Sequence, residues 1–231
     1  MRSSFLVLTG AVVVAACSSS SSGSAPAPNP GPGEGGSDSG GSSGAAPPTP
    51  DGFIAATVGP GSSSPSTVCN LASVEPWLDV GTPTTTGKPV TVPDGGTQSG
   101  ATVNVSCTVT ASGSGFDVSL SIEQQGTEGS TVTITSQPGE GVVTLTGGHG
   151  ITGVFQSGSF GTYRASDCTL AFTYAGSPVQ AQPPIAAGRI WGHISCPAAQ
   201  ISGETTVGPD GGTQDIQCDA EADFLFEQCG Q

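Results

Sequence analysis

Alternation of apolar and polar residues with a period of two is the feature that most restricts the fold of this chain. From 103 to 109 every second residue is valine or cysteine, and the residues between them are polar. After a Gly/Ser-rich stretch at 111–115, the alternation resumes from Phe116 to Ile122. Two such runs joined by a turn predict a β-hairpin. Because one face of each run is polar, a parallel sheet covered on both faces is excluded.

The rest of the chain after residue 50 continues this pattern. Further strands are expected at 131–135, 141–146, 151–156, 168–174, 188–196 and 220–229. Only 71–80 could hold a short helix. Short strands separated by glycine and proline are typical of antiparallel sheets. The predicted fold is therefore all-β: a single disulfide-bonded antiparallel β-sandwich or a partly open barrel.

Six of the seven cysteines lie in this predicted domain. They are Cys69, Cys107, Cys168, Cys196, Cys218 and Cys229. An even number in an exported chain predicts three disulfides, each stabilising the fold by about 2–4 kcal/mol. No CxxC or Cys/His spacing points to zinc instead. Sequence alone leaves all the possible pairings open.

A six-residue string, Pro-Asp-Gly-Gly-Thr-Gln, occurs twice, at 93–98 and at 209–214. Proline followed by glycine favours a tight turn, because proline presets φ and glycine accepts a positive φ. Two cation-binding loops are the alternative interpretation. Each copy lies between two cysteines, which favours the pairs Cys69–Cys107 and Cys196–Cys218 and leaves Cys168–Cys229.

The N-terminus has the plan of a secretory signal. Arg2 precedes an apolar run at 5–14, and small residues follow. The apolar run is shorter than the roughly 20 residues that a membrane-spanning helix needs. The string Val-Ala-Ala-Cys that ends at Cys17 resembles the lipobox of bacterial lipoproteins. The resemblance implies a signal peptide at 1–16, cleaved before Cys17, and acyl chains such as palmitate on that cysteine. An ordinary signal peptide that leaves a free cysteine is the alternative.

Residues 17–50 are expected to form a tether. They are almost entirely Ser, Gly, Pro and Ala, and such a segment buries too little apolar surface to fold. The domain then runs from 51 to 231. Ser18 resembles the residue that directs lipoproteins to the outer membrane, so we expect an exported, lipid-anchored protein there, on either the periplasmic or the surface side.

The combination of lipobox, tether and six-cysteine β domain resembles uncharacterised surface lipoproteins of Gram-negative soil bacteria. The likeness is strongest in the segments 188–197 and 222–229. It implies a membrane partner, reached through the lipid on Cys17, and an envelope protein or glycan as a further partner. It brings no catalytic residue with it.

The charge of the chain restricts its partners. Eighteen acidic residues stand against four basic ones, and the net charge is −14. After the signal, the only basic residues are Lys88, Arg164 and Arg189, and they are scattered. Nucleic acids and anionic lipid headgroups need clustered basic residues and are therefore excluded as partners.

Two strings imitate catalytic or cofactor motifs. Residues 40–44 match GxSxG, but they lie in the tether, where no strand-to-helix turn could expose Ser42 as a nucleophile. Residues 148–153 match GxGxxG, but no helix pattern follows, as a dinucleotide site would require. A glycine-rich β-turn is the better interpretation of the second string.

The candidate sites are few, and we expect a non-catalytic binding or envelope-structural role. A hydrolase that uses His149 or His193, with Ser195 near His193, is one alternative. A second is a carbohydrate- or protein-binding surface module, in which Arg189, Trp191 and His193 share a strand face as a platform. The competing interpretation makes Trp191 a core anchor.

No cofactor is expected, apart from a Ca²⁺ alternative at the acidic end of the chain. Asp219, Glu221 and Asp223 alternate on one face of the last strand, and clustered carboxylates can hold Ca²⁺. A solvated outer face of the strand explains the same pattern.

Overall fold

The structure is a computed structural model that describes residues 48–85, 87–126, 129–136, 142–207 and 210–231. Cys17, the signal at 1–16, most of the tether and the GxSxG string lie outside the described residues. The described residues form strands and turns and no helix. Accordingly, no helix among them is long and apolar enough to cross a membrane.

The domain consists of short and long strands in a single run along the chain. They are β1 Asp51–Gly59, β2 Glu75–Val80, β3 Val92–Pro93, β4 Thr97–Gln98, β5 Ala101–Ser112, β6 Gly115–Gln124, β7 Ser130–Thr135, β8 Val142–Thr144, β9 Gly147–Ser157, β10 Gly161–Ala171, β11 Thr173–Tyr174, β12 Ser177–Pro178, β13 Ile185–Ala186, β14 Arg189–Val207 and β15 Thr213–Glu227.

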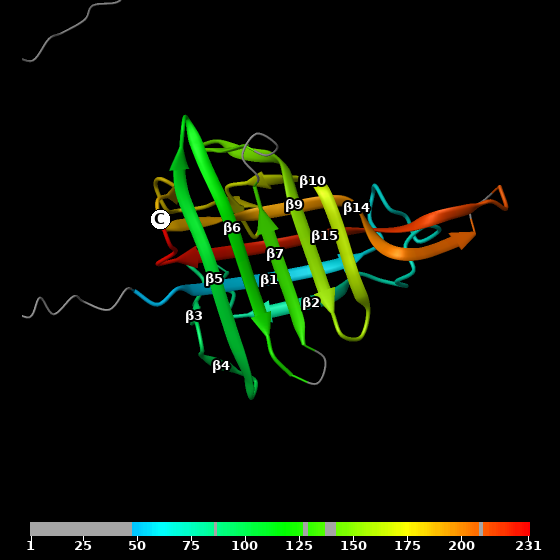
Figure 1. The fold of residues 1–231 in the computed structure, drawn as a ribbon, viewed down its shortest axis with the longest axis horizontal. Coiled ribbons are helices and arrows are strands. Elements are labelled where there is room, and N and C mark those ends of the chain that lie inside the picture. Colours follow the sequence, from blue (N-terminus) through cyan, green and yellow to red (C-terminus); the bar gives the residue numbers. More distant parts are fainter. Residues whose placement is uncertain (1–47, 86, 127–128, 137–141, 208–209) are drawn as a thin grey trace, which may run out of the picture. The chain divides into compact units, whose positions relative to one another are not determined.

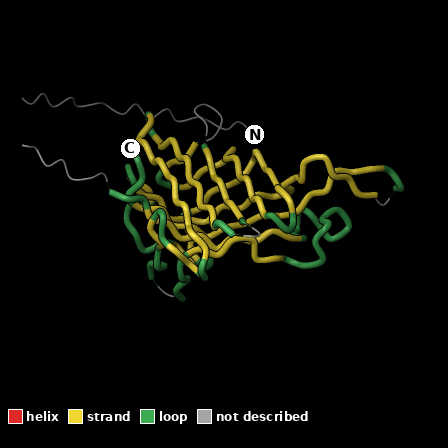
Figure 2. The backbone as a smooth tube through the Cα atoms, turned by 60° about the horizontal axis from the view of Figure 1, so that its bottom comes forward, coloured by secondary structure: helices red, strands yellow, loops and turns green. Residues whose placement is uncertain are grey.

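Thirteen of these strands belong to one antiparallel sheet, whose main path is β2-β1-β15-β14-β10-β9-β7-β6-β5-β4. Strand β10 joins the two halves, since it pairs with β9 on one side and with β14 on the other. Figure 1 shows strands β5, β6, β7 and β9 crossing in front of the layer that contains β14, β15, β1 and β2. The sheet thus folds over itself as a sandwich without closing into a barrel. Figure 2 shows the same layers from another side, with the β14–β15 hairpin extending past them.

The main core lies between the two layers. Inward-facing side chains of both halves are buried there, among them Ile54 and Phe224 from one layer and Leu120 and Ile134 from the other. At Gly52 of β1, an added Cβ would lie 2.7 Å from the Cδ1 atom of Ile122 in β6. The layers are therefore in direct contact, and period-two alternation supplies the apolar face of each.

The structure confirms the predicted all-β fold. The expected hairpin is β5–β6, with Gly113 at its turn at a φ of 57°. The prediction that 71–80 could hold a short helix is wrong, because Glu75–Val80 is strand β2. That strand pairs with β1, and its Trp77 and Leu78 are both buried.

Three disulfides are present, as predicted, but the expected pairing is wrong. The bonds are Cys69–Cys218, Cys107–Cys229 and Cys168–Cys196. The prediction rested on neighbouring cysteines around the repeated Pro-Asp-Gly-Gly string. In the fold, each bond instead joins segments that the sheet topology places side by side, over sequence separations of 149, 122 and 28 residues.

The two Pro-Asp-Gly-Gly copies occupy different places. Gly95 and Gly211 both adopt a positive φ, as expected for this turn. In the first copy, the Asp94 carboxylate accepts a hydrogen bond from the Val105 amide at 2.8 Å, so this turn covers part of the outer edge of β5. The described part of the second copy lies in the connection between β14 and β15. An unprotected strand edge can pair with another chain, and the first copy reduces that exposure.

Candidate functional site

A second apolar cluster lies on the outer face of the sheet. It contains Phe53 of β1, Leu225 of β15, Trp191 of β14, Tyr174 of β11 and Val179. The β11–β12 hairpin and the residues after it lie over this face and bury it. The β1–β15–β14 layer is therefore apolar on both faces, which explains why three successive residues of β15 at 224–226 are all buried.

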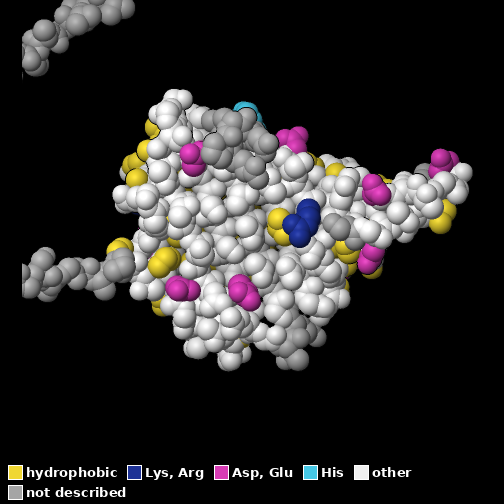
Figure 3. Space-filling view, viewed as in Figure 1, with side chains coloured by type: hydrophobic (Ala, Val, Ile, Leu, Met, Phe, Trp, Pro, Cys, Tyr) yellow, Lys and Arg dark blue, Asp and Glu magenta, His cyan; other side chains and the backbone are white. Residues whose placement is uncertain are grey.

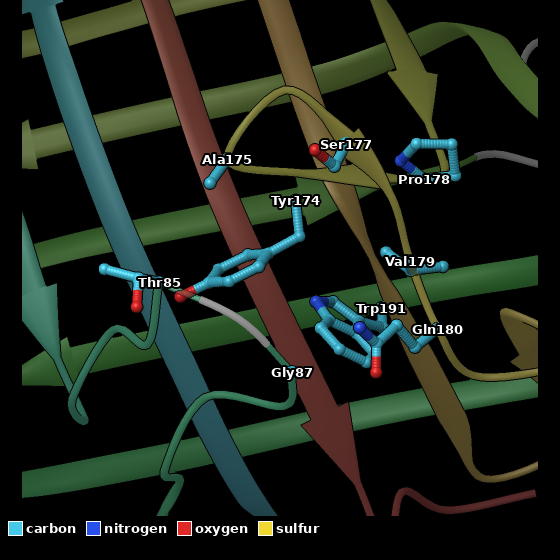
Figure 4. A pocket seen from close by; sticks show the side chains of 9 residues that line it. All are labelled: Thr85, Gly87, Tyr174, Ala175, Ser177, Pro178, Val179, Gln180 and Trp191. Carbon is cyan, nitrogen blue, oxygen red and sulfur yellow. The ribbon is translucent and has the colours of Figure 1, made fainter.

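A pocket opens between this covering segment and the sheet. Its volume is about 140 Å³. It is lined by Thr85, Gly87, Tyr174, Ala175, Ser177, Pro178, Val179, Gln180 and Trp191. Figure 4 shows the rings of Tyr174 and Trp191 beside a common space, with Thr85 on one side and Gln180 on the other. The lining combines two aromatic rings, hydroxyl groups and one amide, and it contains no charged side chain.

The indole of Trp191 forms the buried end of this pocket. Its side chain is only 3% exposed, and its Nε1 group has no hydrogen-bond partner among the described residues. In Figure 4 this nitrogen lies on the edge of the indole nearest Tyr174. A buried donor that lacks an acceptor costs about 1–3 kcal/mol, so this N–H is a strong point of attachment for an acceptor that enters the pocket.

Hydrogen bonds hold the walls of the pocket in place. The Tyr174 hydroxyl accepts a hydrogen bond from the Thr84 amide at 2.9 Å. The Ala175 amide donates to Oδ2 of Asp223 at 3.3 Å. Ala175 has a φ of 48°, a left-handed conformation that is unfavourable for a residue with a Cβ atom. The Asp223 contact therefore helps to hold the β11–β12 turn against the sheet.

Asp223 also binds His193, which lies opposite it in the register of β14 and β15. Nδ1 of His193 lies 2.9 Å from Oδ1 of Asp223. This hydrogen bond raises the pKa of His193, burial opposes the increase, and the charges of Asp223 and Glu221 add to it. The protonated imidazolium is thus favoured in the folded protein.

This pair predicts a pH-dependent stability. Because the folded pKa of His193 is raised, its contribution is fully present below the unfolded value of about 6.5 and is lost as the pH rises through the folded value. We expect His193→Gln to lower the free energy of unfolding by about 1 kcal/mol at pH 5.5, and by clearly less at pH 9. Urea unfolding at both pH values measures the difference.

His149→Gln is the matched control, since His149 is exposed at the start of β9. This variant should follow the parent protein at both pH values. If the loss caused by His193→Gln is equal at the two pH values, the ion pair with Asp223 does not stabilise the fold.

The three residues expected to form a binding platform do not lie together on an open surface. Trp191 is buried under the β11–β12 segment, as the core-anchor interpretation requires. Nη2 of Arg189 donates to the Pro183 carbonyl at 2.7 Å, and His193 is bound to Asp223. Of the three, only Trp191 lines the pocket.

The carboxylates considered for Ca²⁺ are held apart by separate partners. Asp219 accepts hydrogen bonds from the amides of Ser63 and Ala198, whereas Asp223 binds His193 and Ala175. Within the described ranges, no three His, Cys, Asp or Glu side chains lie close enough together to hold a metal ion. The acidic side chains on the face shown in Figure 3 are likewise scattered.

The hydrolase alternative meets a partial arrangement. His193 and Asp223 have the relation of a base and the carboxylate that orients it, and sequence spacing alone did not reveal this carboxylate. In the described part of the chain, no hydroxyl or thiol group forms a hydrogen bond with the other ring nitrogen of His193. Ser195 lies two residues further along β14, opposite Glu221, and His149 is exposed on a different strand.

Several lining residues of the pocket were not predicted from the sequence. Thr85, Tyr174 and Gln180 belong to loops and short strands without a motif, and only folding brings them to Trp191. One local signal was present. The uninterrupted apolar run at 224–226 indicates a strand covered on both faces, and hence a segment that lies over its outer face.

Comparison with known proteins gives no relative from which a function could be transferred. No protein-family model, no curated protein and no solved structure matches this chain.

Proposed function

We propose that this chain is an exported, lipid-anchored protein of the outer membrane whose β domain is a non-catalytic binding module. The signal-like N-terminus and the lipobox-like string at Cys17 support export and anchoring. The three disulfides support the same compartment, because disulfides persist in oxidising surroundings outside the cytosol. More than one acyl chain on Cys17 would give a firm anchor.

The unpartnered indole N–H of Trp191 in the pocket is the observation that carries the binding proposal. The second tryptophan, Trp77, provides a comparison within the same chain. Its Nε1 group is also buried without a partner, but it does not line the pocket, and its ring packs against Phe160 and Tyr163. Only at Trp191 can a ligand from solution provide the missing acceptor.

The pocket is also prepared for binding before a ligand arrives. Its walls are fixed by the contacts of Tyr174 with Thr84 and of Ala175 with Asp223. A site with ordered walls loses less conformational entropy on binding, which leaves more of the contact energy as affinity. A hydrolase is not proposed, because His193 has no nucleophile bonded to it among the described residues.

The anchor is tested by Cys17→Ser in the full chain. We expect the variant either to leave the membrane fraction or to accumulate as an uncleaved precursor, because serine cannot take the lipid through a thiol. Ser18→Asp is the matched control, since aspartate at this position resembles the signal for retention in the inner membrane. That variant should stay membrane-bound. A Cys17→Ser protein that is still cleaved and acylated contradicts the proposed anchor.

The pocket is tested by fluorescence in a Trp77→Phe background, where Trp191 is the only remaining tryptophan. We expect a saturable change of Trp191 emission with at least one small ring compound from a panel of phenol, cyclohexanol and glucose. The indole lines the cavity, so an occupant alters its surroundings directly. A flat response to the whole panel contradicts the binding proposal.

A further inference from the structure

We propose that the pocket beside Trp191 binds a single neutral sugar ring, either a free hexopyranose or the terminal unit of a glycan. This inference rests on the proposed binding function and names its ligand class. Three properties of the pocket carry it: its size, its uncharged but polar lining, and the direction of its unpartnered donor.

The size of the pocket selects one ring. Its volume of about 140 Å³ is close to that of a protein cavity of about 150 Å³ that binds benzene. A six-membered ring fits such a space, whereas a disaccharide does not fit inside it. Further units of a glycan would extend from the opening, where Ser177 and Gln180 are exposed.

The lining selects a neutral, polyhydroxylated ring. Thr85, Ser177 and Gln180 present hydroxyl and amide groups around the aromatic rings of Tyr174 and Trp191. No lining residue is charged, and the chain has a net charge of −14, so an anion finds no counter-ion there and is repelled. A purely apolar ring would leave these polar groups without partners. A pyranose offers C–H groups to the aromatic rings and hydroxyl groups to the polar side chains.

The indole N–H gives the ring an orientation. Nε1 of Trp191 is a donor only, and it is buried without a partner on the edge nearest Tyr174. A hydroxyl or ring oxygen of the sugar accepts this hydrogen bond at the closed end of the pocket. Binding thereby satisfies a group that the folded protein leaves unpaired.

The experiment is calorimetric titration of the disulfide-bonded protein with glucose, galactose, mannose and N-acetylglucosamine. Phenol serves as an aromatic ring of similar size, and glucuronate as a charged sugar. We expect at least one neutral sugar to bind more tightly than phenol, and more tightly than glucuronate. Trp191→Phe keeps an aromatic ring but removes the N–H, and it should weaken sugar binding about five- to tenfold.

Two further variants separate the pocket from effects on folding. Trp77→Phe makes the same replacement outside the pocket and should leave the affinity unchanged. Ser177→Ala alters an exposed rim residue, leaves the core intact, and should weaken binding about threefold.

The outcomes distinguish the two proposals. If phenol binds and no neutral sugar does, the sugar assignment is overturned while the binding pocket stands. If none of the compounds binds, the binding function itself is overturned. Sugar binding that is unaffected by both Trp191→Phe and Ser177→Ala places the sugar elsewhere and also overturns this inference.

Discussion

Removing the Cys107–Cys229 disulfide by replacing both cysteines with serine is expected to lower the free energy of unfolding by about 2–5 kcal/mol. The bond spans 122 residues, and a cross-link over a long loop strongly restricts the unfolded chain. It also holds the C-terminal segment against the outer edge of β5. There, the Val109 amide donates to the Gly230 carbonyl at 3.0 Å, and the Gly230 amide donates to the Cys107 carbonyl at 3.0 Å.

Loss of this bond should therefore have a local effect as well as a global one. With the C-terminal segment released, the edge of β5 near Val109 becomes available for pairing with another chain. We expect faster amide exchange at Val109 and a greater tendency to aggregate. Guanidinium unfolding, hydrogen exchange and light scattering measure the three effects.

The Cys168–Cys196 bond provides the comparison. It spans only 28 residues and joins β10 to β14, away from the edge of β5. Replacing that pair should also lower stability but should leave Val109 protected under native conditions. Equal protection of Val109 in both double variants would show that Cys107–Cys229 does not guard the edge.

Gly153→Ala is expected to destabilise the protein by about 1–3 kcal/mol, although glycine-to-alanine changes in a strand often stabilise. Gly153 lies in β9 and faces the Cys168–Cys196 disulfide. An added Cβ would lie 2.7 Å from Sγ of Cys196 and 3.1 Å from Sγ of Cys168. Both cysteines are fully buried and bonded to each other, so neither sulfur can swing away.

Gly126→Ala is the matched control, because an added Cβ there meets no atom within 4 Å. We expect its stability to equal or slightly exceed that of the parent. A third protein, in which Gly153→Ala is combined with alanine at both Cys168 and Cys196, should show a smaller penalty from the added methyl group. Urea unfolding compares the proteins, and a Gly153→Ala variant as stable as Gly126→Ala contradicts the predicted clash.

Gly153 also shows what the GxGxxG string at 148–153 means in this protein. The sequence predicted a glycine-rich turn rather than a dinucleotide site, and the segment proves to lie within strand β9 and to open no helix. The last glycine of the string is required by a disulfide whose partners come from two other strands. The string alone gives no sign of that contact.

The strands themselves were predictable from the sequence, because alternation is a local property. Side chains of an extended strand point to opposite faces, so the valines at 103–109 reveal one buried face without knowledge of their partners. The all-β fold, the β5–β6 hairpin and the existence of three disulfides follow from such local patterns and from the even number of cysteines. Strand β2 was missed, because Pro76 and Asp79 interrupt the alternation.

Only the tertiary structure decided the cysteine pairing, the burial of Trp191 and the contact of His193 with Asp223. Each depends on strand register and on which segments cover the sheet, and both arise from contacts between residues far apart in the chain. His193 and Asp223 are 30 residues apart and face each other only because β14 and β15 pair in this register. Trp191 lies on a strand face that looks solvent-accessible in the sequence, and the β11–β12 hairpin folds over it. Alternation tells which side chains share a face, but not what packs against that face.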